Sequence, residues 1–139
     1  MITVTSLTKV YGVGDKAVAA VQDVSLHVPP GGIFGILGRS GAGKTTLMRC
    51  LTALERPTSG SVTVADAELT SLNGAQLRSV RHRMGMIFQH FNLLNSRTAA
   101  ENVAFPLEVQ GVGKSKRNTR VAELLDMVGL ADRTQSYPS

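Results

Sequence analysis

A glycine-rich turn between an apolar run and an amphipathic run constrains this 139-residue chain more than any other feature. Residues 38–45, GRSGAGKT, satisfy the pattern G-x-x-x-x-G-K-[ST]. The preceding apolar run IFGIL, residues 33–37, predicts a short, fully buried strand of the kind found in parallel sheets. After the turn, apolar residues recur at helical spacing and predict a helix from about residue 44 to 54: Leu47, Met48, Leu51 and Leu54. This strand, loop and helix together predict an α/β fold.

The residue types of the turn predict a site for a nucleoside triphosphate and Mg²⁺. Gly41 and Gly43 permit backbone conformations in which successive N–H groups curl around an anion, and the helix start adds free N–H groups and a positive dipole end. Lys44 is expected to bridge the β- and γ-phosphates, and the Thr45 hydroxyl is expected to ligate Mg²⁺. The loop residues expected to contact the nucleotide are Gly38, Arg39, Ser40, Gly41, Ala42, Gly43, Lys44, Thr45 and Thr46.

Composition argues against disorder and against a membrane-spanning chain. Apolar residues make up 42% of the sequence and charged residues 18%, as in folded α/β domains. No apolar run approaches 18 residues, and the first ten residues lack the pattern of a secretory signal, so we expect a cytoplasmic location. The single cysteine, Cys50, cannot form an internal disulfide and is expected to be a small buried hydrophobe.

The net charge of +5 falls mainly in two short segments, residues 78–83 and 114–120. Both segments fit solvated helix faces, and neither contains the interleaved aromatic residues that would stack on bases. We therefore expect no nucleic-acid partner. A basic surface that faces phosphates remains the alternative.

Three segments alternate apolar and polar residues at period two and predict half-exposed strands: 2–6, 23–28 and 61–65. Residues 85–89, GMIFQ, also have strand character. Leu77, Val80 and Met84 are spaced as on a helix face.

Two further helices are predicted after these strands. Thr98 and Glu101 form a capping-box pattern that opens the first, which Pro106 is expected to kink or end. Ser115 is expected to cap the last helix, and Gly129 stands where its C-terminal stop belongs. The apolar face predicted for the last helix comprises Val121, Leu124, Leu125 and Val128.

The stretch GILGRSGAGKTTLMRCLTALERPTSGSVTV, followed by RMGMIFQHFNLLNSRTAAENVAFPL, resembles the nucleotide-binding domain of an ABC transporter. The second stretch most resembles the ATPase subunit of methionine importers. The resemblance covers essentially the whole chain. It implies a P-loop NTPase of ABC type whose mixed sheet includes an antiparallel β subdomain. It also implies a P-loop at 38–45, a Q-loop near residue 89 and the start of a helical subdomain over about 95–139.

The resemblance adds two site residues outside the loop. Tyr11 matches an aromatic residue that follows the first strand and stacks on adenine, although a surface tyrosine is the plain alternative. Gln89 matches a strand-end glutamine that reaches the Mg²⁺ and the attacking water and senses the membrane subunit; a strand-end polar residue is the plain alternative. We therefore expect Lys44 and Gln89 to contribute to catalysis and Thr45 and Gln89 to bind Mg²⁺. These residues do not make up a complete catalytic site.

Other positions carry interpretations that the sequence leaves open. Residues 92–103 resemble the segment that leads into the helical subdomain, where the permease docks, and Leu93 and Leu94 fit either core or docking surface. Asp66 matches a structural turn position. Ala67 stands where a turn glycine is usual in the family, which leaves the conformation of that turn open.

In the family, the chain continues into the LSGGQ signature, the catalytic glutamate and a switch histidine, none of which occurs within these 139 residues. We therefore expect a truncated, N-terminal part of an ATPase subunit that by itself binds ATP weakly at most and does not hydrolyse it.

The implied partners are a transmembrane permease, a substrate-binding protein and a second ATPase subunit, at the cytoplasmic face of the membrane. The implied function is ATP-driven uptake of methionine or a similar amino acid. The alternatives are the ATPase of another ABC system, for another amino acid, lipoprotein release or cell division, and a non-hydrolysing nucleotide-binding regulator.

Overall fold

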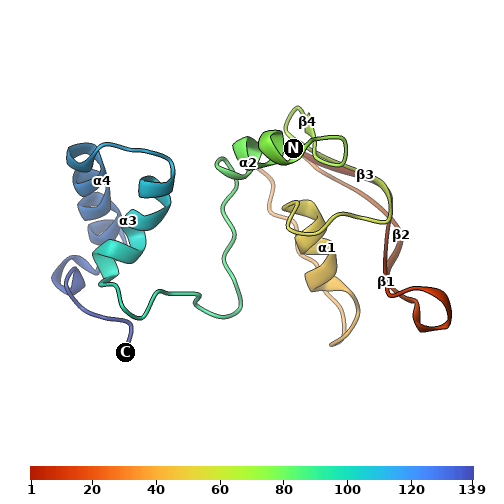
Figure 1. The fold of residues 1–139 in the computed structure, drawn as a ribbon, viewed down its shortest axis with the longest axis horizontal. Helices are drawn as coiled ribbons and strands as arrows, with labels where there is room; N and C mark the ends of the chain where they lie inside the picture. Colours follow the sequence, from red (N-terminus) through yellow and green to blue (C-terminus); the bar gives the residue numbers. More distant parts are fainter. The chain divides into compact units, whose positions relative to one another are not determined.

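The computed structural model describes all of residues 1–139, which divide into two compact units, Met1–Met86 and Ile87–Ser139 (Figure 1). The first unit contains the sheet and two helices, and the second is helical. None of the helices combines the length and apolarity that crossing a membrane requires. The elements in chain order are β1 (Ile2–Tyr11), η1 (Gly14–Lys16), β2 (Val18–Val28), α1 (Lys44–Leu51), β3 (Ser59–Val64), β4 (Ala67–Glu68), α2 (Gly74–Arg81), α3 (Ala99–Val109), α4 (Lys114–Met127) and η2 (Ala131–Arg133).

The first unit is built on a four-stranded antiparallel sheet in the order β2-β1-β3-β4. The segments 2–6 and 23–28 predicted as strands lie within β1 and β2, and the third, 61–65, forms the end of β3 except for residue 65, which lies in the following turn. The β1–β2 register shifts between Val4 and Leu7, where Ser6 has a φ of 44° and donates its N–H to the Ser25 hydroxyl at 2.8 Å. This irregularity bends the strand pair, as β-bulges do.

The core of the first unit lies between the sheet and α1. Leu7, Val62 and Cys50 are its largest fully buried side chains. Cys50 is thus the buried hydrophobe that the sequence predicts, and burial raises the pKa of its thiol. Its other buried members are Val4, Val21, Leu47, Leu51, Ala53, Leu69 and Leu77.

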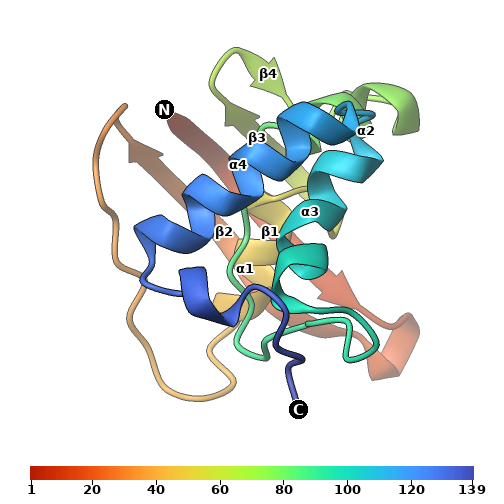
Figure 2. The ribbon, with the colours of Figure 1, turned by 90° about the vertical axis from the view of Figure 1, so that its left-hand side faces the viewer.

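Two predicted strands do not form. Residues 33–37 have no regular secondary structure, and the Leu37 side chain is 96% exposed instead of buried. Residues 85–89 are likewise without strand, and Ile87 is fully exposed. The physical reason is that neither segment has a pairing partner. A strand of a parallel sheet needs hydrogen-bonded neighbours, whereas the strand pairs in residues 1–139 are all antiparallel and involve only β1 to β4. The open course of the segment between β2 and α1 is visible in Figure 2.

Helix α1 begins at Lys44, as predicted, and ends three residues before the predicted Leu54. Ala53 has a φ of 53°, and the Leu54 N–H donates to the Arg49 carbonyl at 2.9 Å. This Schellman arrangement turns the chain back and buries the Ala53 methyl group in the core. The tertiary packing of Ala53 therefore ends the helix earlier than its apolar spacing suggests.

Helix α2 carries the predicted buried Leu77, while Met84 lies beyond its end. Its N-terminus has a capping box that we did not predict, in which the Asn73 side chain accepts from the Gln76 N–H at 3.0 Å and the Gln76 side chain accepts from the Asn73 N–H at 3.0 Å. The Arg81 guanidinium donates to the Ala53 carbonyl and so joins α2 to the end of α1.

The β3–β4 turn resolves the question about Ala67. Val64 pairs with Ala67, so Ala67 belongs to β4 and the two-residue turn consists of Ala65 and Asp66. Ala65 is the residue with positive φ, at 52°. Asp66 is exposed in this turn.

In the second unit, α3 opens with the predicted capping box. The Glu101 N–H donates to the Thr98 hydroxyl at 3.2 Å, and the Thr98 N–H donates to the Glu101 carboxylate at 2.7 Å. The hydrogen bond from the Thr98 N–H lowers the pKa of the Glu101 carboxyl group. Pro106 does not end the helix, which continues to Val109.

Helix α4 packs beside α3 around buried Ala104, Val121 and Leu125 (Figure 2). Ser115 does not cap α4, because Gly113 is the N-cap residue and Ser115 already lies within the first turn. Gly129 is the predicted stop, with a φ of 70° and a Schellman arrangement closed by the Leu130 N–H on the Leu125 carbonyl at 2.8 Å. The predicted apolar face is shorter than expected, since Val128 lies beyond the helix and is exposed.

The Asn102 side chain holds the segment before α3 in place. Its amide nitrogen donates to the carbonyls of Leu94, Arg97 and Thr98 at 3.1, 3.0 and 2.9 Å, and its oxygen accepts from the Leu94 N–H at 2.8 Å. One residue of α3 therefore bonds to four backbone groups of a segment that has no regular structure, with its two amide hydrogens shared among three carbonyls.

Replacing Asn102 by alanine is expected to destabilise the second unit by about 1–3 kcal/mol, because the Arg97 carbonyl and the Leu94 N–H lose their hydrogen-bond partner. Hydrogen exchange should show faster exchange of the Leu94 amide in this variant. Asn118→Ala is the matched control, since Asn118 is exposed on α4. Equal protection of the Leu94 amide in both variants would contradict the prediction.

Candidate nucleotide-binding site

The glycine-rich loop joins the open segment 33–37 to α1. Gly41 and Gly43 have φ values of 80° and 82°, in the region that glycine adopts without strain. The Ala42 N–H donates to the Arg39 carbonyl at 3.2 Å, so the loop closes on itself just before the helix. Gly43 is the N-cap residue of α1, and no side chain caps the helix.

Gly43 lies in direct contact with the neighbouring sheet. A Cβ atom at this position would collide with the backbone carbonyl oxygen of Ala20 on β2, whereas a Cβ at Gly41 would meet nothing within 4 Å. The backbone of β2 thus holds one end of the loop, and only glycine fits at the point of contact. The sequence carries no signal of this contact with Ala20.

The start of α1 presents unpaired backbone donors. The N–H groups of Gly43, Lys44, Thr45 and Thr46 donate to no backbone or side-chain acceptor. Such groups at a helix N-terminus, together with the helix dipole, favour an anion. The local geometry is therefore that of an anion site.

Lys44 adds a positive charge to the same place. Its Nζ atom donates to the carbonyls of Gly38 and Arg39, both at 2.8 Å. The ammonium therefore lies against the first residues of the loop. Thr45 is exposed and its hydroxyl makes no hydrogen bond in the structure. The hydroxyl oxygen is therefore free to act as a ligand to a hard cation.

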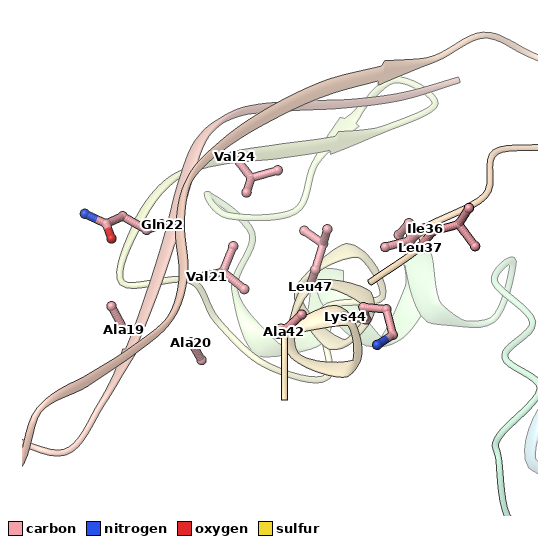
Figure 3. A pocket seen from close by; sticks show the side chains of 11 residues that line it. Ala19, Ala20, Val21, Gln22, Val24, Ile36, Leu37, Ala42, Lys44 and Leu47 are labelled. Carbon is pink, nitrogen blue, oxygen red and sulfur yellow. The ribbon is translucent and has the colours of Figure 1, made fainter. Parts of the chain in front are cut away.

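A cavity of about 360 Å³ lies beside the loop, between β2, α1 and residues 36–37. Figure 3 shows Val21 and Val24 of β2 pointing towards Leu47 of α1, while Gln22 points away. Ala42, Gly43 and Lys44 form the part of its wall that belongs to the loop.

Tyr11 is the last residue of β1 and not, as predicted, a residue that follows it. It pairs with Val18, which is two residues from the Ala20 that contacts Gly43. Tyr11 is 37% exposed. The structure therefore brings Tyr11 and the loop 38–46 to the same end of the β1–β2 pair.

Gln89 belongs to the second unit, where it lies in an exposed bend. The strand whose end it was predicted to occupy is absent. The first unit thus holds the loop and Tyr11 but not Gln89.

Lys9 is a residue of this region that the sequence analysis did not single out. Its Nζ atom lies 2.8 Å from the Glu55 carboxylate and 4.9 Å from the centroid of the Tyr11 ring. The hydrogen bond to Glu55 raises the pKa of Lys9. The spacing of Lys9 and Tyr11 on one strand could have suggested a shared face, but nothing in the sequence connects Lys9 with Glu55.

Two solved structures define the class of protein. A dimeric post-hydrolysis state of the ATP-binding cassette MJ0796 bound to ADP and Pi superposes with a TM-score of 0.89 at 31% identity, over 99% of this chain and 62% of that one. A dimeric structure of MJ0796, described as a bacterial ABC transporter cassette, gives a TM-score of 0.88 at 32% identity, over 99% and 61%. The fold is thus that of an ATP-binding cassette, which confirms the predicted α/β P-loop class.

Residues 21–139 match the family model described as ABC transporter, and the chain belongs to this family. Curated relatives include the methionine import ATP-binding proteins MetN of Geobacillus kaustophilus, 55% identical over 100% of this chain and 41% of the relative, and of Streptomyces griseus, 54% identical over 99% and 40%. MetN 1 of Salmonella typhimurium is 53% identical over 100% and 40%. The chain therefore spans about two fifths of the length of these relatives. The resemblance to methionine importer ATPases is confirmed.

Proposed function

We propose that the protein is the ATP-binding subunit of an ABC importer that couples ATP hydrolysis to the uptake of methionine or a similar amino acid. The observation that carries the ATP-binding part is the loop 38–46, in which the N–H groups of residues 43–46 are unpaired and the Lys44 ammonium donates to two carbonyls of the same loop. The amino-acid part is supported by three relatives named for methionine import that are 53–55% identical to this chain.

The loop residues fit the phosphates of Mg·ATP. The N–H groups of residues 43–46 would hold phosphate oxygens, and the Lys44 ammonium, which donates to the Gly38 and Arg39 carbonyls in the structure, would supply positive charge to the β- and γ-phosphates. The free Thr45 hydroxyl would hold Mg²⁺, which would neutralise phosphate charge. The contacts of Gly38, Arg39, Ser40, Gly41 and Ala42 are made through the backbone of the loop.

Tyr11 and Gln89 complete the proposed set of nucleotide contacts. Tyr11, an exposed residue at the end of the β1–β2 pair, would stack its ring on adenine. Gln89 would hold the Mg²⁺ and the attacking water through its neutral amide. Within residues 1–139, Lys44 and Gln89 are the two residues that we propose to contribute to hydrolysis.

The proposed partners are a transmembrane permease at the cytoplasmic face of the membrane, a substrate-binding protein and a second copy of the subunit. The two similar solved structures are described as dimeric. Leu93 and Leu94 are exposed and so do not belong to the core of the second unit. We assign them to the surface that meets the permease.

The proposal predicts that Lys44→Ala weakens binding of Mg·ATP to the complete subunit by about 10- to 100-fold, because a charge-assisted contact to the phosphates is lost. Isothermal titration calorimetry measures this effect. Lys114→Ala is the control, since Lys114 lies in the second unit at the start of α4. Unchanged affinity in Lys44→Ala would refute the phosphate role of the loop.

Residues 1–139 alone are proposed to bind Mg·ATP weakly at most and not to hydrolyse it. Phosphate release by this segment should therefore not exceed that of its Lys44→Ala variant. Methionine uptake by cells that carry the complete importer, compared with cells that carry the Lys44→Ala subunit, tests the transport part.

A further inference from the structure

The Lys9 ammonium lies in a fixed position at the end of β1. Its Nζ atom is 2.8 Å from the Glu55 Oε1 atom and donates to the Arg56 carbonyl at 2.8 Å. The Lys9 side chain is only 14% exposed. These two bonds use two of the three donors of the ammonium.

The residues that hold Lys9 are themselves anchored. The Glu55 N–H donates to the Arg49 carbonyl of α1 at 3.1 Å, and the Arg56 guanidinium donates to the Leu72 carbonyl at 2.7 Å. Both residues that contact Lys9 are therefore held by a further hydrogen bond, Glu55 to α1 and Arg56 to Leu72. Lys9 is tied to the same helix whose N-terminus carries the candidate phosphate site.

The anchored ammonium lies over the ring of Tyr11. Lys9 and Tyr11 are two residues apart on β1 and so project to one side of the strand, and the distance from Nζ to the ring centroid is 4.9 Å. A cation at this distance is attracted to the face of an aromatic ring. The ammonium thus occupies one of the two faces of Tyr11, and 37% of the residue remains exposed.

We infer that Lys9 is a positioning residue for base recognition, in which the ammonium held by Glu55 fixes the Tyr11 ring and leaves only its opposite face for a purine base. This inference rests on the proposed stacking role of Tyr11. Lys9 makes no contact with the nucleotide itself. The ammonium restricts the orientations of the ring before a base binds. Less conformational entropy is then lost on binding, which strengthens the binding of the base.

The inference predicts that removing the Lys9 charge weakens the binding of the base and leaves the binding of the phosphates unchanged. Lys9→Met preserves the length of the side chain and removes the charge. In the complete subunit, this variant is expected to bind Mg·ATP about 3- to 10-fold more weakly, while its affinity for Mg·tripolyphosphate, which lacks a base, changes by less than about twofold. Glu55→Gln should also weaken Mg·ATP binding, but by less than Lys9→Met does, and should likewise leave the affinity for Mg·tripolyphosphate nearly unchanged.

The Tyr11→Ala background provides the decisive comparison. Without the ring, Lys9→Met should have no further effect on Mg·ATP affinity, whereas Tyr11→Phe, which keeps the ring, should preserve the effect. Lys16→Met is the matched control, because Lys16 lies in η1 and has no contact with Tyr11. Calorimetric titrations and a thermal melt of each variant supply the measurements.

Four results would overturn the inference. One is an unchanged Mg·ATP affinity in a folded Lys9→Met subunit. Another is an equal loss of Mg·ATP and Mg·tripolyphosphate affinity, which would show a general structural role. The third is a loss that persists unchanged in the Tyr11→Ala background. If Tyr11→Ala itself leaves Mg·ATP affinity unchanged, the proposed stacking role of Tyr11 fails together with the inference, while Lys44→Ala still tests the phosphate site separately.

Discussion

Gly43→Ala is expected to abolish measurable Mg·ATP binding and to destabilise the first unit, whereas Gly41→Ala is expected to have a much smaller effect. Both glycines have nearly the same positive φ, 80° at Gly41 and 82° at Gly43. Their surroundings differ, because a Cβ at Gly43 collides with the Ala20 carbonyl of β2 and a Cβ at Gly41 lies in open space. The pair therefore separates backbone strain from steric collision.

The two contributions have different sizes. A left-handed conformation costs a residue with a Cβ about 1–2 kcal/mol, and both variants bear this cost. The collision at residue 43 meets backbone on a paired strand, which cannot yield as a flexible side chain does, and overpacking of this kind adds about 1–3 kcal/mol. Relief of the collision requires the loop to move away from β2, which displaces the N–H groups of residues 43–46 from their common direction.

Thermal unfolding and calorimetric titration with Mg·ATP check this prediction. The midpoint of unfolding should fall further in Gly43→Ala than in Gly41→Ala, and only Gly43→Ala should lose binding entirely. Equal losses of stability and affinity in the two variants would show that the contact between Gly43 and Ala20 does not hold the loop.

Leu7→Ala is expected to destabilise the chain by about 2–5 kcal/mol, the range measured for large-to-small substitutions in cores. Leu7 is 0% exposed and lies on β1, where the strand bulges against β2. Removing three carbon atoms there leaves a cavity that the paired strands cannot close. Because folded domains are stable by only about 5–15 kcal/mol, the loss is a large part of the total.

Leu37→Ala is the counterpart to this substitution. Leu37 is 96% exposed, so its replacement in these 139 residues should change the free energy of unfolding by less than about 0.5 kcal/mol. Urea unfolding followed by circular dichroism measures both values. A loss at Leu37 as large as that at Leu7 would mean that residues 33–37 are buried as the sequence predicts.

The features predicted correctly from the sequence depend on neighbouring residues. Thr98 and Glu101 cap each other within one helical turn, and Gly129 adopts the positive φ that ends a helix, so both can be recognised from a few residues. The start of α1 at Lys44 is of the same kind, because the glycines before it set the backbone for the turn. Most of the candidate phosphate site is therefore predictable.

Predictions failed where the outcome depended on a distant segment. The alternating strands formed because each finds an antiparallel neighbour, whereas residues 33–37 and 85–89, although apolar, find no strand partner. Helix α1 ended early because Ala53 packs into the core. The prediction for Ser115 failed for a local reason instead, since Gly113 is the N-cap residue and α4 already begins at Lys114.

The sequence by itself determined the identity of the loop, its place before a helix and the family to which the chain belongs, because these depend on residue order within short segments. Only the tertiary structure decided that β2 touches Gly43 at Ala20, that Tyr11 ends β1 beside the loop, and that Lys9 meets Glu55. Such contacts join residues more than 20 positions apart. Burial and the pairing of strands bring them together, and no local pattern encodes that distance.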